Sequence, residues 1–230
     1  MPAGDYVWTI GDTGCPDNTG TFTIISPVKP DFNISSQDVS CFGANDGIIE
    51  ILSPVVQSGR TFTVFINGTS QGVQTSFFNV VPGNYQITLV DNFGCESDPE
   101  LVVIGQPDRP LEITNLVIDN ANCFGSNTGS IEFEILGGRP VYRATLTPIS
   151  GPVQTLTNLS QNTVYSFGSL GAGNYTLEVW DINNVCQVTE LVTITQPSLF
   201  TVTADSGTIL CFGGSTFIEL TPFGGTEPYS

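Results

Sequence analysis

The stretch Cys123-Phe124-Gly125-Ser126-Asn127-Thr128-Gly129 opens a pattern that recurs along the chain. An alternating apolar run follows it, then a Gly-Gly-Arg-Pro turn at 137–140, and later the run Gly173-Asn174-Tyr175. The triplet Cys-Phe-Gly also occurs at Cys41 and Cys211, with spacings of 82 and 88 residues, and a second cysteine follows each Gly-x-Tyr run. Self-similarity of this kind indicates a tandem array of structural repeats.

Connectors that contain a late proline mark the boundaries of the repeats. They are Ile25-Ser26-Pro27, Gly105-Gln106-Pro107 and Thr195-Gln196-Pro197, and such linkers are typical joints between domains. The predicted domains are therefore the C-terminal part of a preceding repeat (1–28), repeat one (29–108), repeat two (109–198) and the N-terminal part of a following repeat (199–230). Met1 aligns with internal residues of the repeat, so we expect an excerpt of a longer chain.

Short strands separated by turns fill each repeat. Ile131, Phe133 and Ile135 alternate with two glutamates, as in a strand with one buried and one solvated face. Further strands are predicted at 111–118, 142–147, 153–159, 164–170 and 189–195, and the shorter repeat one has less room for a counterpart of 153–159. About seven short strands in a repeat of this length are typical of an immunoglobulin-like sandwich. We therefore predict an all-β fold of tandem antiparallel β-sandwiches.

The parity of side chains along the strands predicts the core. We expect buried side chains at Tyr85, Ile87, Leu89, Tyr175, Leu177 and Val179, and exposed ones at Glu50 and Glu132. The Leu-x-x-Gly-x-Tyr pattern resembles the tyrosine corner of such sandwiches, in which the hydroxyl bonds back to the preceding turn.

The two tryptophans have opposite parity. Trp8 shares the inward parity of Tyr6 and Ile10, which predicts a core position. Trp180 should face outward, where an aromatic ring can be covered at a joint or can stack on a sugar. Trp180 is therefore the candidate for a surface ligand contact.

Composition excludes several classes of function. Five basic residues stand against 22 acidic ones, for a net charge of −17, whereas nucleic-acid binding needs clustered Lys and Arg. No apolar run approaches the roughly twenty residues of a membrane-spanning helix. The chain has no His and no CxxC motif, which argues against a zinc site and against a nucleophile-and-base pair. We therefore predict no catalytic residues, no cofactor site and no enzyme activity.

Calcium is a weaker candidate. Asp12, Asp91 and Asp181 follow the Gly-x-Tyr strands, and the amides Asn92, Asn183 and Asn184 lie beside two of them. Calcium prefers such oxygen-rich loops. However, Asp and Asn also build turns through their own side chains, and we favour that interpretation.

The motifs in combination closely resemble the SprB-type repeats of Bacteroidetes gliding-motility adhesins. The matching elements are the CFGxNxG stretch, the Gly-Gly-Arg-Pro-Val-Tyr turn, the Gly-Asn-Tyr strand, the run from Asp181 to Cys186 and the Gln-Pro joint. Repeat one departs at 59–62, where Gly-Arg-Thr-Phe replaces the turn. The resemblance implies a very large cell-surface filament, exported across the outer membrane by the type IX system and moved by the gliding motor.

Two functions remain open at this point. The first is a stalk of adhesive repeats, outside the cell, whose partners are an external surface or polysaccharide, other copies, or the gliding and secretion machinery. The second is an array of carbohydrate-binding modules of a secreted polysaccharide-degrading protein. Such modules need an exposed aromatic side chain in every copy, but the counterparts of Trp180 are Val90 and Gly11. The sequence therefore favours the stalk.

Six cysteines at matched places predict disulfides and an extracytoplasmic compartment, and three pairings remain open. One lies within a repeat, Cys41 with Cys95 and Cys123 with Cys186. In a sandwich these turns lie at opposite ends of strands of roughly 23 Å, whereas bridged Cα atoms lie within about 7 Å. The second joins sequence neighbours: Cys15 with Cys41, Cys95 with Cys123 and Cys186 with Cys211. The third joins successive domains, Cys41 with Cys186.

Overall fold

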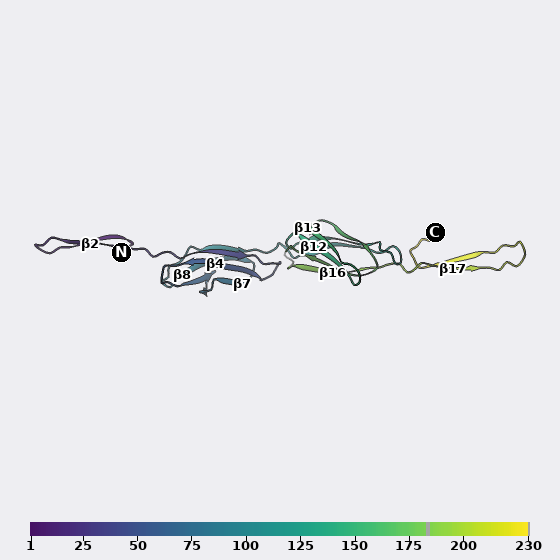
Figure 1. Cartoon of the computed structure of the whole chain (residues 1–230), viewed down its shortest axis with the longest axis horizontal. Coiled ribbons are helices and arrows are strands. Elements are labelled where there is room, and N and C mark those ends of the chain that lie inside the picture. The colour runs from purple at the N-terminus through teal and green to yellow at the C-terminus, as the bar shows by residue number, and fades with distance from the viewer. Residues whose placement is uncertain (183–184, 230) are drawn as a thin grey trace. The chain divides into compact units, whose positions relative to one another are not determined.

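The protein is described by a computed structural model that covers residues 1–182 and 185–229, and within these residues all regular structure is β-strand (Figure 1). The strands belong to two compact units. One contains residues 1–39 and 45–105, and the other contains residues 40–44 and everything from residue 106 onward. Residues 40–44, which hold the first Cys-Phe-Gly triplet, therefore cluster with repeat two. No helix in the described part of the chain is long and apolar enough to cross a membrane.

Repeat one is a sandwich of two antiparallel sheets. Its strands are β3 (Asp31–Gln37), β4 (Gly47–Val55), β5 (Phe62–Ile66), β6 (Thr69–Gly72), β7 (Ser76–Val80), β8 (Gly83–Asp91) and β9 (Glu100–Ile104). One sheet has the order β3-β4-β7 and the other β6-β5-β8-β9. The short β6 is the counterpart of the predicted strand at 153–159, so the smaller repeat has this strand too.

Repeat two has the same topology, strand for strand. Its strands are β10 (Glu112–Asp119), β11 (Gly129–Leu136), β12 (Tyr142–Pro148), β13 (Gln154–Leu159), β14 (Tyr165–Leu170), β15 (Gly173–Trp180) and β16 (Gln187–Ile194). The sheets have the orders β10-β11-β14 and β13-β12-β15-β16. Two antiparallel sheets of three and four strands give each repeat the architecture of the immunoglobulin-like sandwich, as predicted.

The core lies between the two sheets, and strand parity predicted most of it. Ile87, Leu89, Leu177 and Val179 are all fully buried. The predicted burial of the two tyrosines is only partly correct, because both rings lie at the start of their strands and remain half-buried. Glu132 is exposed as predicted, whereas Glu50 is half-buried, so its prediction was wrong.

The tyrosine corner is present in each copy of the Gly-x-Tyr pattern. The hydroxyl of Tyr85 donates to the carbonyl of Val81 at 2.8 Å, and that of Tyr175 donates to Gly171 at 2.9 Å. Tyr6 makes the same bond to the residue four positions before it, at 2.6 Å. The hydroxyl bond keeps each ring at the end of the strand, which explains why these tyrosines are only half-buried.

The terminal segments form two-stranded hairpins. In the first, β1 (Gly4–Ile10) pairs with β2 (Asn18–Ile24), and in the last, β17 (Thr201–Ser206) pairs with β18 (Ile218–Phe223). Trp8 lies across the hairpin over Gly20, yet it is 38% exposed, and Ile10 is more exposed still. The core position predicted for Trp8 is therefore wrong, because among the described residues no second sheet covers this hairpin.

Candidate functional site: the cysteine turns

Each Cys-Phe-Gly triplet forms the same tight turn. The carbonyl oxygens of Cys41, Cys123 and Cys211 accept hydrogen bonds of 3.0–3.1 Å from the backbone N–H three residues later. The glycine of each triplet has a positive φ of 73–79°, which type II turns require at their third position and which glycine adopts without strain. The motif is thus a turn signal. The phenylalanine of each triplet is exposed, and so are Cys123 and Cys211, whereas Cys41 is half-buried.

The glutamine of the Gln-Pro connector holds this turn in place. The side-chain oxygen of Gln106 accepts the backbone N–H of Gly43 at 2.9 Å, and that of Gln196 accepts the N–H of Gly125 at 2.7 Å. Gln106 and Gln196 lie 63 and 71 residues after the glycines that they bind. The connector therefore does more than separate repeats, because its glutamine is hydrogen-bonded to the turns at Cys41 and Cys123.

The second cysteine of each repeat lies on a loop that an aspartate organises. Asp91 Oδ1 accepts the backbone N–H groups of Phe93 and Cys95, both at 2.9 Å. In repeat two, Asp181 Oδ1 accepts the N–H groups of Val185 and Cys186, both at 3.4 Å. These bonds agree with the turn interpretation of the aspartates.

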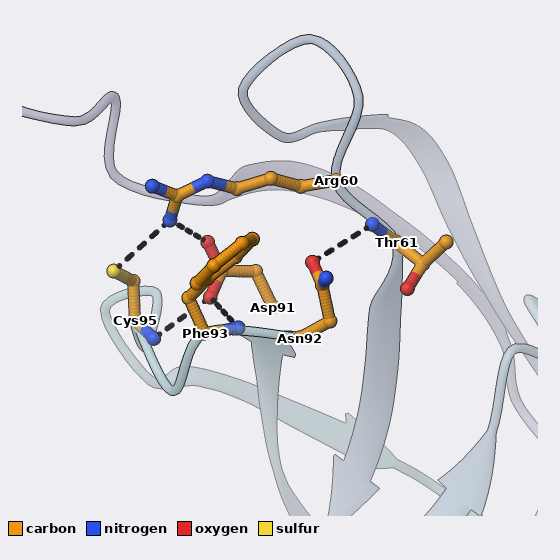
Figure 2. A network of polar contacts seen from close by, with 6 residues as sticks. All are labelled: Arg60, Thr61, Asp91, Asn92, Phe93 and Cys95. Carbon is orange, nitrogen blue, oxygen red and sulfur yellow. Dashed lines mark hydrogen bonds and ion pairs between the residues drawn. The ribbon is translucent and has the colours of Figure 1, made fainter.

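In repeat one an arginine completes this loop (Figure 2). Arg60 Nη1 donates to Asp91 Oδ2 at 2.5 Å, and the carboxylate is fully buried. Burial alone would raise the pKa of Asp91. However, the hydrogen bond from Arg60 and those from the N–H groups of Cys95 and Phe93 outweigh burial and lower the pKa to about 2. Asp91 therefore stays ionised down to strongly acidic pH.

The same guanidinium reaches the sulfur of the loop. Arg60 Nη1 lies 3.3 Å from Cys95 Sγ, and the Arg60 Cζ lies 4.5 Å from the centroid of the Phe93 ring (Figure 2). Sequence reasoning missed this cluster, because Arg60 stood out only as a departure from the Gly-Gly-x-Pro turn. The pairing register of two strands could have revealed it. Phe62 on β5 pairs with Asp91 on β8, so a basic residue just before β5 lies beside that carboxylate.

One disulfide joins two of the turns. Cys41 and Cys186 are bonded, with Cα atoms 5.6 Å apart and 145 residues between them in sequence. This is the third of the three pairings, the one that links successive repeats. Cys95, Cys123, Cys15 and Cys211 are free thiols. Cys123 and Cys186 are not bonded to each other because they lie at opposite ends of β15. The cysteine turn at Cys123 leads into Gly129, which pairs with Leu170 just before β15 begins, whereas Cys186 follows the end of β15.

The candidate ligand residue Trp180 lies on the outward side of its strand, as its parity predicted. It is half-buried, and the guanidinium of Arg143 on the neighbouring strand lies 5.9 Å from its ring centroid. Part of the ring face is therefore covered by a side chain of the same repeat. Binding of a sugar there stays a prediction.

The aspartates proposed as calcium ligands do not gather into a shared site. Asp91 and Asp181 bond to their own loops, and no group of three or more His, Cys, Asp or Glu side chains within the described residues is placed to hold a metal ion. Two of the amides named with them, Asn183 and Asn184, lie outside the described residues. Calcium binding stays a prediction.

Comparison with known proteins gives a family match for one segment of the chain. Residues 115–151 match the SprB repeat, a segment that runs from β10 through the cysteine turn and β11 into β12. Among solved structures, a two-domain fibronectin type III segment from chicken tenascin is 16% identical, covering 72% of this chain and 99% of that one. Its TM-score is 0.29, so the assignment of the sandwich depends on the strand order described above. No curated protein matched the chain.

Proposed function

Because the chain carries a SprB-type repeat at residues 115–151, we propose that it is part of the stalk of a very large cell-surface adhesin used in gliding motility and surface attachment. The recurrence of the cysteine turn and the tyrosine corner outside the matched segment supports extending this role to the whole chain. The match to the SprB repeat is the observation that carries the proposal.

The physical character of the repeats fits a stalk. Each sandwich buries its own core, so reach can be increased by adding repeats, and a net charge of −17 keeps such an array soluble and self-repelling. A disulfide that joins the cysteine turn at 41 to repeat two suits an oxidising compartment outside the cytoplasm. We place the chain outside the outer membrane, exported by the type IX system, with an external surface or polysaccharide as its partner.

The proposal is tested on cells. Antibodies against the 230-residue chain should label intact source cells, and latex beads coated with these antibodies should be carried along the surface of gliding cells. Beads coated with antibodies against a cytoplasmic protein of the same cells are the control. Labelling only after the cells are lysed would overturn the assignment, and labelled beads that never move would remove the gliding role.

The alternative is an array of carbohydrate-binding modules, which Trp180 keeps open because part of its ring remains exposed. A glycan array probed with the isolated chain separates the two. The stalk predicts no binding that depends on Trp180, whereas the module predicts binding that Trp180→Ala abolishes. Arg143→Ala is the matched variant, because it uncovers the ring and should strengthen binding if a sugar stacks there. We propose no enzyme activity for either role.

A further inference from the structure

Two clefts beside the cysteine turns are built from equivalent residues. The cleft at Cys41 is lined by Phe42, Pro110, Leu111, Gly138 and the loop at 185–187. The cleft at Cys123 is lined by the counterparts of these residues, namely Phe124, Leu199, Phe200 and Gly225. The counterparts follow from shared contacts: Gly138 N–H donates to the carbonyl of Arg109, and Gly225 N–H donates to the carbonyl of Ser198.

One wall distinguishes the two clefts. Beside Cys41, the loop Val185–Gln187 closes the cleft and Cys186 bonds to Cys41, leaving a volume of about 300 Å³. Beside Cys123, the described residues supply no such loop, the cleft measures about 420 Å³, and Cys123 is exposed with a free thiol. The remaining walls are already in place, because the side-chain hydroxyl of Thr226 donates to the carbonyl of Asn122 at 3.4 Å.

We propose that the cleft at Cys123 is the seat of the second-cysteine loop of the repeat that begins at residue 199, and that this cysteine bonds to Cys123. The occupant is the counterpart of Val185–Gln187, a short loop with an apolar residue before the cysteine. By the same rule Cys95, which is the counterpart of Cys186 in repeat one, would bond to the cysteine turn of the repeat before it. The inference goes beyond the proposed stalk role, because it holds whatever surface the repeats attach to.

The other cysteines are poorly placed to take this position. Cys211 lies beyond the far end of β17, whereas the cleft is at the near end, beside residues 198–200. A six-residue strand separates the two by roughly 20 Å, and a disulfide needs Cα atoms within about 7 Å. Cys186 lies past the far end of β15 and is already bonded to Cys41. Neither Cys211 nor Cys186 therefore fits the cleft at Cys123, whereas the second cysteine of the repeat that begins at residue 199 would lie where Cys186 lies beside Cys41.

Formation of the bond is an oxidation, and its balance is simple. The two thiols lose two protons and two electrons, and an Sγ–Sγ bond forms between them. A disulfide oxidant accepts the electrons by opening its own S–S bond into two thiols. Oxidised glutathione serves this purpose in the test below, and a thiol oxidant of the extracytoplasmic compartment would serve it in the cell.

The test completes the third sandwich. Residues 144–198 of repeat two are appended after Ser230, which is the counterpart of Arg143, so that the chain gains a copy of Cys186. The appended copy carries Val185→Ile, which makes its cysteine peptide one methylene heavier than the native one. After folding in oxidised glutathione, free thiols are alkylated and disulfide-linked peptides are identified by mass spectrometry without reduction.

We expect a linked peptide that joins Cys123 to the heavier cysteine peptide, while Cys123 of the original 230-residue chain is recovered alkylated or capped by glutathione and not linked to another cysteine of the chain. The native bond between Cys41 and Cys186 reports in the same sample that the chain has folded. The proposal is overturned if that native bond forms but Cys123 remains alkylatable or carries only glutathione, or if Cys123 is found bonded to Cys95, to Cys211 or to the native Cys186 peptide. Neither result depends on adhesion or gliding, so the proposed function is tested separately.

Discussion

Arg60 links the charge of a buried aspartate to the geometry of the second-cysteine loop. Asp91 holds the N–H groups of this loop through one carboxylate oxygen and the Arg60 guanidinium through the other (Figure 2). In repeat two, Asp181 Oδ2 has no hydrogen-bond partner among the described residues. The two repeats therefore reach the same loop fold with different electrostatics, and only the cysteine of repeat two is in a disulfide here.

The first prediction follows from this cluster. Arg60→Met keeps an apolar stem near Phe93 but removes the charge, so the pKa of Asp91 should rise above its present value of about 2. Because the folded pKa lies below the ordinary value of 3.8, ionised Asp91 stabilises repeat one above about pH 4. This stabilisation is lost as the pH falls from there to about 2. In the variant the folded pKa moves toward the ordinary value, so the stabilisation above pH 4 should be smaller and its loss should be complete at a higher pH.

A carboxyl NMR titration of Asp91, together with acid unfolding followed by circular dichroism, measures both effects. Arg143→Met is the matched control, because it removes a guanidinium that covers Trp180 in the other repeat. The control should leave the titration of Asp91 unchanged. An Asp91 titration that is identical in the wild type and in Arg60→Met would show that the guanidinium does not set this pKa.

The second prediction tests strand parity at one core residue. Leu177 is fully buried on β15, and Leu177→Ala should lower the free energy of unfolding of repeat two by about 2–5 kcal/mol. Leu191→Ala on the paired strand β16 is the control, because Leu191 is 82% exposed and its truncation should change stability by less than about 0.5 kcal/mol. Urea titration measures both, and equal losses in the two variants would refute the parity assignment.

At the scale of elements, the final glycine of the CFGxNxG stretch explains how β11 enters the sandwich. A Cβ on Gly129 would lie 2.9 Å from the carbonyl oxygen of Leu170 and 2.8 Å from the Ile194 methyl group. In repeat one, Gly47 meets Val80 and Ile104 in the same way. The glycine is thus required by close approach of β11 to β14 and β16, and its φ is not positive.

The third prediction is that Gly129→Ala destabilises repeat two by about 1–3 kcal/mol, the usual cost of an overpacked core. Gly168→Ala on β14 is the matched control, since a Cβ there has no atom within 4 Å and its backbone is not left-handed. That change should be neutral or stabilising by up to about 1 kcal/mol, because alanine restricts the unfolded chain. Differential scanning calorimetry compares the two, and a tolerated Gly129→Ala would contradict the close approach.

Much of this architecture is readable from the sequence, because alternation and turn residues act locally. The strands and the tyrosine corner both depend on residues within a few positions of one another. The errors occur where a distant segment decides the outcome. The exposure of Trp8 depends on whether a second sheet covers its hairpin, and the ion pair of Arg60 depends on the pairing of β5 with β8. The spacing of the cysteines in the sequence left three disulfide pairings open, because the packing of distant segments decides which cysteines meet.

At the scale of the whole molecule, the disulfide changes how tension passes along the chain. The bond joins Cys41, which follows β3, to Cys186, which precedes β16, and the 145-residue separation between them becomes a closed loop. A force applied at the two ends therefore passes from β3 through the sulfur atoms into β16. The strands from β4 to β15 lie within the loop, so unfolding them adds nothing to the length of the stretched chain.

The last prediction is a measurement of this effect by single-molecule pulling from both termini. An extended chain spans about 3.3–3.6 Å per residue. The disulfide therefore excludes the 145 residues of the loop, a contour length of roughly 500 Å, from the stretched chain. We expect the fully unfolded wild-type chain to be shorter by that amount under oxidising conditions than after treatment with dithiothreitol. The variant Cys41→Ser should show the longer value in both conditions, whereas Cys15→Ser, which removes a free thiol, should behave as wild type. A reductant-independent contour length in the wild type would mean that tension does not bypass the two sandwiches.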